Sequence, residues 1–431
     1  MINFSETIKQ YKAVFWSLFI KNSFAHNISS TFITRVSVIF IGTVVSIVTS
    51  RYLGPAGKGI LATLTAIIAL AVQFGNFGMQ SANTYFISSK KSNLASIISN
   101  SVWISMIGGT LISLSIVIYL FINKHLLQDI PALLIMLTLI CVPFNLFYLF
   151  GQNILIGIKK INLYNIIELL NTGLSAILII VSLIILHYQI KSIIVVIAMT
   201  AILIDCILIL KLTKISKTLL TFNYQLFKVM FSYGLKIYLA SLFAFLMLRI
   251  DIFMVKYYLG IEEVGFYSIA VNMADLLYML PVTIASLLFP KIAEMKTIIQ
   301  KYQIAAKTAI LTGIIMAPFL LIAPLFSKYI INIMYGSNFS AAVPAFAWLM
   351  PGIFFLSLAT IIGIVFAASG MPWFSLAPYL FAAILNIVLN LFLISKYNIA
   401  GASISSTISY LFLLICNYIG IRIMIKKARI E

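Results

Sequence analysis

Long apolar segments recur along almost the whole chain, and they constrain its fold more than any other feature. Twelve such segments can be drawn, each of about 20 residues or more, which is the length needed to cross the hydrocarbon core of a bilayer. The composition, with 62% hydrophobic and 9% charged residues, lies far from that of soluble domains. Only helices and closed barrels satisfy all backbone polar groups within lipid. We therefore predict an all-α membrane protein with spans over residues 31–50, 59–79, 97–122, 131–157, 163–187, 191–210, 231–256, 264–289, 303–326, 341–367, 374–394 and 399–424.

A short hairpin signature occurs twice and indicates an internal duplication. Residues 53–59 (LGPAGKG) separate the first two spans, and residues 259–265 (LGIEEVG) separate the seventh and eighth. Gly54 and Gly260 are 206 residues apart in a chain of 431. Each half contains six spans, an even number, so both halves begin on the same side and the repeat is parallel. We predict two six-helix bundles, residues 1–215 and 216–431.

The distribution of Lys and Arg predicts the orientation. With the N-terminus inside, the cytoplasmic segments hold 19 of these residues and the outer segments hold 7, Lys58 among them. By the positive-inside rule both termini are cytoplasmic and both hairpins face outward. The apolar run 13–20 is too short to span and is flanked by lysines, so we expect it to lie on the cytoplasmic membrane surface. The net charge of +19 is spread over short loops, which argues against a nucleic-acid partner.

Three ionisable residues are concentrated around the second hairpin. Arg249 and Asp251 lie in the outer half of the seventh span, and Asp275 lies near the middle of the eighth. Residues two apart on a helix point about 200° apart, so Arg249 and Asp251 should face different neighbours. Asp275 has two interpretations: it neutralises Arg249, or it binds a coupling ion while Arg249 binds an anionic substrate. We favour the second, because a carboxylate at mid-depth between two bundles suits an ion that is bound and released.

Other charges lie nearer the cytoplasmic side. Arg35 is a candidate for substrate binding, because a guanidinium can hold a phosphate through two parallel hydrogen bonds. Lys236 joins Arg35 and Arg249 as the third candidate substrate-binding cation. Lys236 and Asp205 also lie close to span ends, where their side chains can instead reach the membrane interface. Asp251 and Asp275 complete the candidate site as ion-coupling or charge-pairing acids.

No pattern typical of catalysis or of a resident metal stands out. The three histidines are not deep in any span, the three cysteines are scattered singly in apolar segments, and no loop is long enough to fold an active site. We expect a transporter that is not an enzyme and that has no cofactor, with H⁺ or Na⁺ as the candidate coupling ion.

Several motifs resemble those of one family. Residues 51–59 (RYLGPAGKG) resemble the opening signature of polysaccharide biosynthesis transporters, the Wzx-type O-antigen flippases. Arg249-Ile250-Asp251 followed by residues 259–270 resembles the span 7–8 signature of these proteins, and Tyr335-Gly336 and residues 386–402 fit as well. The family belongs to the multidrug/oligosaccharidyl-lipid/polysaccharide exporter superfamily. Asn398 departs from the family pattern, which often has Gly there.

The resemblance implies both a fold and a function. The fold is a MATE-like, V-shaped pair of six-helix bundles with a cationic lumen. The function is to flip undecaprenyl-pyrophosphate-linked oligosaccharide repeat units, for O-antigen, capsule or a similar glycan, across the cytoplasmic (inner) membrane by alternating access. Partners would be this lipid-linked substrate, membrane lipids, and the glycan polymerase and chain-length machinery of lipopolysaccharide biosynthesis. A drug/ion antiporter of the same fold should have an acidic lumen instead, and a membrane enzyme of glycan assembly should have catalytic groups in an outer loop.

Overall fold

The computed structural model describes residues 23–123, 128–186, 189–216, 221–370 and 372–428. Side chains are described within these ranges from residue 30 onward, except at 236 and 372–375. The surface segment predicted at 13–20 lies outside them. All regular elements of the described residues are helical, which confirms the predicted all-α class.

The helices follow one another with short connections. The first half contains α2 (Ser23–Asn76), α3 (Met79–Ser88), α4 (Leu94–Trp103), the π-helical turn η1 (Ile104–Gly108), α5 (Gly109–Ile122), α6 (Ala132–Gly157), α7 (Ile161–Ile180), the π-helical turn η3 (Val181–Ile185) and α8 (Ile190–Ser216). The second half contains α9 (Tyr224–Leu259), α10 (Ile261–Ala293), α11 (Ile298–Met334), the short 3₁₀ helix η4 (Ser337–Phe339), α12 (Ala342–Ala368) and α13 (Pro372–Lys427).

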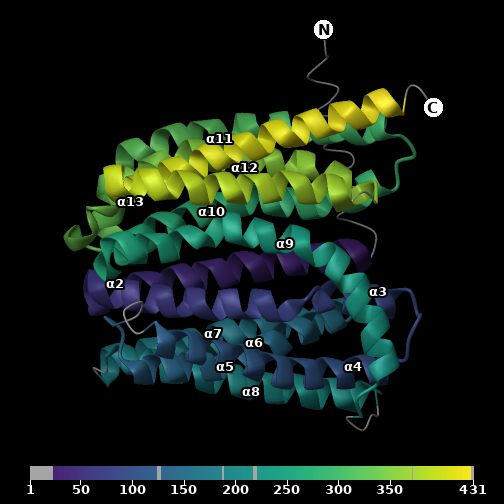
Figure 1. Cartoon of the computed structure of the whole chain (residues 1–431), viewed down its shortest axis with the longest axis horizontal. Helices are drawn as coiled ribbons and strands as arrows, with labels where there is room; N and C mark the ends of the chain where they lie inside the picture. Colours follow the sequence, from purple (N-terminus) through teal and green to yellow (C-terminus); the bar gives the residue numbers. More distant parts are fainter. Residues whose placement is uncertain (1–22, 124–127, 187–188, 217–220, 371, 429–431) are drawn as a thin grey trace.

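Ten helical stretches of the described residues are long and apolar enough to cross a membrane. Two of them, of 47 and 52 residues within α2 and α13, are far longer than the roughly 20 residues that one crossing needs. Each contains one residue with a non-helical backbone, Gly54 in α2 and Asn398 in α13, and each folds back on itself there (Figure 1). The predicted first and second spans thus lie in α2, and the eleventh and twelfth in α13.

The predicted hairpin repeat is visible in the backbone. Gly54 has φ 66° and ψ −177°, and Gly260, between α9 and α10, has φ 95° and ψ −179°. Both angles lie in a region that glycine adopts without steric cost and that other residues avoid. The two turns lie with that of Asn398 at the left of Figure 1, and we call this side the hairpin end.

The two hairpins also contact each other, backbone against backbone. A Cβ atom at Gly59 would overlap the carbonyl oxygen of Ile261, and a Cβ atom at Gly265 would overlap the carbonyl oxygen of Pro55. These contacts are reciprocal, because Gly265 and Ile261 stand 206 residues after Gly59 and Pro55. Such reciprocity is what a twofold relation between two units produces.

The halves lie side by side, with α2 to α8 below and α9 to α13 above in Figure 1. The first turns of α9 cross over to the first half. Met230 is fully buried in a cluster with Met79 and Phe86, and the rings of Tyr85 and Tyr233 stack with centroids 4.3 Å apart. By packing, therefore, the beginning of α9 lies against the first half and its remainder belongs to the second.

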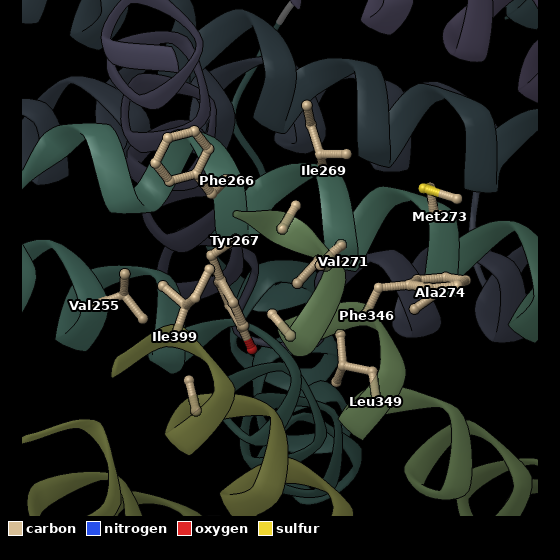
Figure 2. Packing of buried hydrophobic residues seen from close by; sticks show 14 of the residues in the cluster. Val255, Phe266, Tyr267, Ile269, Val271, Met273, Ala274, Phe346, Leu349 and Ile399 are labelled. Atoms are coloured by element: carbon tan, nitrogen blue, oxygen red, sulfur yellow. The ribbon is translucent and has the colours of Figure 1, made fainter. Parts of the chain in front are cut away.

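A buried cluster joins the helices of the second half (Figure 2). Val255 comes from α9, Tyr267 from α10, Phe346 from α12 and Ile399 from α13. Tyr267 is fully buried, and Figure 2 shows its ring beside Ile399 with the hydroxyl at the far end. This apolar packing positions the Tyr267 hydroxyl for the polar cluster described below.

The contact between the hairpins leads to a test of stability. Gly59→Ala should lower the free energy of unfolding by about 1–3 kcal/mol, because the added methyl group must displace the backbone of Ile261. The measurement is thermal unfolding of the purified protein in detergent. Gly173→Ala is the matched control, since a Cβ there meets nothing within 4 Å. Unchanged stability of Gly59→Ala would contradict the close approach.

Candidate functional site

Arg249 and Asp275 form an ion pair inside the second half. The Arg249 Nη2 atom lies 2.8 Å from Asp275 Oδ2, and the side chains are 34% and 41% exposed. Arg249 stands ten residues before the end of α9, and Asp275 fourteen residues after the start of α10. These positions are about 15 and 21 Å along the helix axes from the hairpin end. The pair therefore lies near the middle of a hydrocarbon core about 30 Å thick.

Asp251 faces another way, as its spacing from Arg249 predicts. It is 2% exposed and accepts hydrogen bonds from the Ile252 backbone N–H at 2.9 Å and from the Ser406 hydroxyl at 3.4 Å. The Tyr267 hydroxyl donates a further, short hydrogen bond to the same carboxylate. Three helices, α9, α10 and α13, thus converge on this one buried acid.

Two asparagines of α13 extend this polar cluster. The Asn386 amide donates to the Ser406 hydroxyl at 3.3 Å, and the Asn390 amide donates to the Asn386 Oδ1 atom at 3.0 Å. Both residues are completely buried, and the Asn390 Oδ1 atom has no hydrogen-bond partner within the described residues. Carboxylate, hydroxyl and amide oxygens together suit a hard cation. We call Asp251, Tyr267, Asn386, Asn390 and Ser406 the Asp251 cluster.

A second polar cluster lies in the first half. Glu168 on α7 accepts hydrogen bonds from the Tyr148 hydroxyl at 2.9 Å and from the Gln152 amide at 3.2 Å, both on α6. Arg35 on α2 is partly exposed and lies near Tyr164 of α7, which also lies near Glu168. Arg35 thus lies on the same side of the first half as this acidic residue.

Lys236 and Asp205 are the two ionisable residues that the sequence places near span ends. Lys236 lies in α9, but its side chain falls outside the described residues. Asp205 was predicted to reach the membrane interface, and this is wrong. Its side chain on α8 is 1% exposed, and neither carboxylate oxygen has a hydrogen-bond partner among the described residues. The sequence position near a span end did not reveal that this face of α8 packs inside the bundle.

At the hairpin end, polar contacts join the two halves. Lys256 Nζ lies 3.2 Å from Asp129 Oδ2, and Arg51 Nε donates to the Met334 carbonyl oxygen at 2.9 Å. A second guanidinium nitrogen of Arg51 donates to the carbonyl oxygen of Ile333. The last carbonyl groups of a helix lack intrahelical partners and carry partial negative charge, so a cation is favourable there. The Arg249–Asp275 pair and the Asp251 cluster thus lie deeper along the helices than the hairpin end, where these contacts join the two halves.

The sequence reasoning missed several members of these clusters. Tyr267, Asn386 and Ser406 carry no signal of their own, because apolar spans commonly contain single hydroxyl and amide side chains. Only their convergence on Asp251 distinguishes them. No group of three or more His, Cys, Asp and Glu side chains that could hold a metal ion occurs among the residues that the structure covers.

The chain is similar in sequence to a described family and to several individual proteins. The family described as polysaccharide biosynthesis protein matches residues 24–296, more than half of the chain. A putative O-antigen transporter from Shigella flexneri is 26% identical over 188 residues, which is 43% of this chain and 45% of that protein. A probable low-salt glycan biosynthesis flippase, Agl15 from Haloferax volcanii, is 24% identical over 205 residues, 46% of this chain and 43% of that protein. The matches cover less than half of the length of these relatives.

Solved structures share the fold at low sequence identity. An inward-facing multidrug resistance MATE family transporter has a TM-score of 0.73 and 16% identity, with 92% of this chain and 98% of that chain covered. The lipid II flippase MurJ in an inward closed conformation has a TM-score of 0.68 and 17% identity, with 91% and 86% covered. The MATE-like fold that the family resemblance implied is therefore confirmed.

The ion pair leads to a double-mutant cycle. Arg249→Leu and Asp275→Leu should each destabilise the protein, because each leaves its partner without a counterion, and the double substitution should cost less than the sum of the two. The expected coupling is about 0.5–3 kcal/mol, the range for residues in contact. The measurement is thermal unfolding of the four proteins in detergent. Additive effects would contradict a stabilising interaction between these side chains.

Proposed function

The chain belongs to the polysaccharide biosynthesis protein family, and on that premise we propose that it flips a lipid-linked oligosaccharide from the inner to the outer leaflet of a membrane. The substrate we infer is a polyprenyl-diphosphate-linked repeat unit for O-antigen, capsule or a similar glycan. Two relatives carry matching descriptions, a putative O-antigen transporter and a probable glycan biosynthesis flippase. Transport without catalysis, as expected from the sequence, is part of this proposal.

One observation supports this proposal above the others: partly exposed charges inside helices of membrane-crossing length. Arg249 and Asp275 keep about a third or more of their side-chain surface exposed near mid-depth. A charge exposed to hydrocarbon is costly, and such residues almost always face a bundle interior or a water-filled cavity. We therefore infer a hydrated passage along the seam between the halves.

Arg249 and Arg35 are the proposed phosphate-binding residues, one from each half. A diphosphate offers several oxygens to a guanidinium and can compete with the carboxylate that holds it. Lys236 remains a third candidate on the basis of its sequence position. In this proposal Asp275 is the exchangeable partner of Arg249, so that the guanidinium is neutralised when no substrate is bound.

The Asp251 cluster is the proposed site of the coupling ion. Its buried carboxylate accepts from the Tyr267 and Ser406 hydroxyls, and the hydrogen bonds continue from Ser406 through Asn386 to Asn390, whose Oδ1 atom has no partner among the described residues. This set suits Na⁺, and the carboxylate alone could instead take up H⁺. Asp251 replaces Asp275 as our preferred ion-binding residue, because Asp275 already has Arg249 as its counterion.

The proposal also assigns a location and partners. The ten membrane-length apolar helices among the described residues make this a multi-pass membrane protein. From the distribution of Lys and Arg we propose the cytoplasmic membrane with both termini in the cytoplasm. A flippase delivers its substrate to the outer surface, so we expect the glycan polymerase and chain-length machinery to act next.

Transport of the lipid-linked glycan is directly testable. Depletion of the protein should cause lipid-linked repeat units to accumulate on the inner leaflet. Arg249→Ala should abolish or strongly reduce flipping, because it removes a phosphate-binding charge, whereas Arg249→Lys should retain part of the activity. The measurement is glycan export at matched protein level. Near-normal export by Arg249→Ala would rule out an essential role for this residue.

Ion coupling has its own test. Imposed Na⁺ or H⁺ gradients should accelerate flipping by the wild-type protein in proteoliposomes. Asp251→Asn should respond to neither gradient, because it removes the negative charge that attracts the ion. Glu262→Gln, which neutralises an exposed carboxylate at the hairpin end, serves as the control and should respond like the wild type. A normal gradient response by Asp251→Asn would exclude this site.

A further inference from the structure

Lys58 is a buried cation without an acidic partner among the described residues. It is 5% exposed, and its ammonium group donates to the Ser46 hydroxyl at 3.0 Å, the Thr49 hydroxyl at 3.3 Å and the Ser46 carbonyl oxygen at 3.5 Å. All these acceptors are neutral. A buried charge is costly unless it is paired, and neutral oxygens only partly replace water. Its place in an outer hairpin segment, as counted from the sequence, gave no sign of this burial.

The ammonium group lies at the seam between the two halves. Ala62 and Ala66 follow Lys58 by one and two helical turns on the same face, and both pack against the buried cluster of the second half. Ser46, which accepts from Lys58, also accepts from the Asn272 amide of α10 at 3.4 Å. The Ser46 hydroxyl thus connects the Lys58 ammonium group with Asn272 of the second half.

The fold itself does not require a charge at this position. The equivalent residue of the second repeat, 206 residues later, is Val264. Val264 is fully buried in the apolar cluster of the second half. An aliphatic side chain is thus accommodated at this position in the second half. Folding alone does not explain why the first half has a lysine there.

We propose that Lys58 binds a phosphate group of the transported lipid when the seam opens at the hairpin end. This inference rests on the proposed flippase function and adds the site from which the substrate leaves. Separation of α10 from α2 would remove Asn272 from Ser46 and expose the ammonium group to the passage. A phosphate oxygen could then supply the counter-charge that Lys58 lacks in the closed arrangement. Arg249 lies deeper, so the phosphate would move from a mid-depth cation to one nearer the hairpin end.

The test compares the two faces of the membrane. Membrane vesicles of opposite orientation receive a fluorescent polyprenyl-diphosphate-linked N-acetylglucosamine as the probe. Lys58→Met should raise the apparent KM for probe entering at the hairpin end by about tenfold or more, as expected for the loss of a hydrogen bond to a charged group. The apparent KM from the opposite face should not change, and Lys58→Arg should behave like the wild type.

A second buried lysine provides the matched control. Lys301 is 8% exposed and donates to the Ala368 carbonyl oxygen at 2.6 Å, so Lys301→Met removes a comparable charge elsewhere. It should leave the apparent KM at the hairpin end unchanged. An unchanged apparent KM in folded Lys58→Met, or an equal rise on both faces, would overturn the proposal. If the wild type moves no probe in either direction, the flippase function itself fails.

Competition experiments on the wild type identify the source of the phosphate and do not depend on folding of a variant. Inorganic pyrophosphate at the hairpin end should raise the apparent KM of the probe if Lys58 recognises the diphosphate. A rise only when phosphatidylglycerol replaces phosphatidylcholine in proteoliposomes would instead assign the phosphate to ordinary lipid headgroups. Failure of both competitors would overturn the proposal.

Discussion

The two halves approach each other so closely at the hairpin end that their backbones touch. Gly59 and Gly265 permit this contact, and each faces a carbonyl oxygen of the opposite hairpin. Within a membrane, helices gain little from the hydrophobic effect when they associate, so close packing of small residues and specific polar contacts hold them together. The ion pair of Lys256 with Asp129 and the hydrogen bonds of Arg51 to the end of α11 supply such polar contacts beside the glycines.

The two halves repeat the hairpin backbone but not their charges. The residue 206 positions away, in the other half, is neutral for every candidate residue. The equivalents of Arg249, Asp251, Asp275, Arg35 and Lys58 are Thr43, Val45, Ala69, Ser241 and Val264. The fold is therefore satisfied by neutral side chains at each position. Each of these charges has no charged counterpart in the other half, and this separates the requirements of folding from those of transport.

Features of the sequence predicted the structure best where the membrane restricts which groups can be exposed to lipid. The apolar spans, the repeated Leu-Gly hairpin and the opposite faces of Arg249 and Asp251 all follow from periodicity and from the cost of exposing polar groups to lipid. The surroundings of Asp251 could not be predicted, because Ser406 is 155 residues distant and only tertiary packing brings the two together. Asp205 was misplaced for a related reason. Proximity to a span end does not tell which face of a helix is buried.

The position of Arg249 suggests how ion and substrate could depend on each other. Its guanidinium interacts electrostatically with both Asp275 and Asp251, although only Asp275 is hydrogen-bonded to it. A cation bound in the Asp251 cluster would cancel one of the two negative charges near Arg249. The guanidinium would then attract a diphosphate more strongly, and by linkage a bound diphosphate would stabilise the cation. In this way α9, which carries both Arg249 and Asp251, would connect two sites that share no ligand.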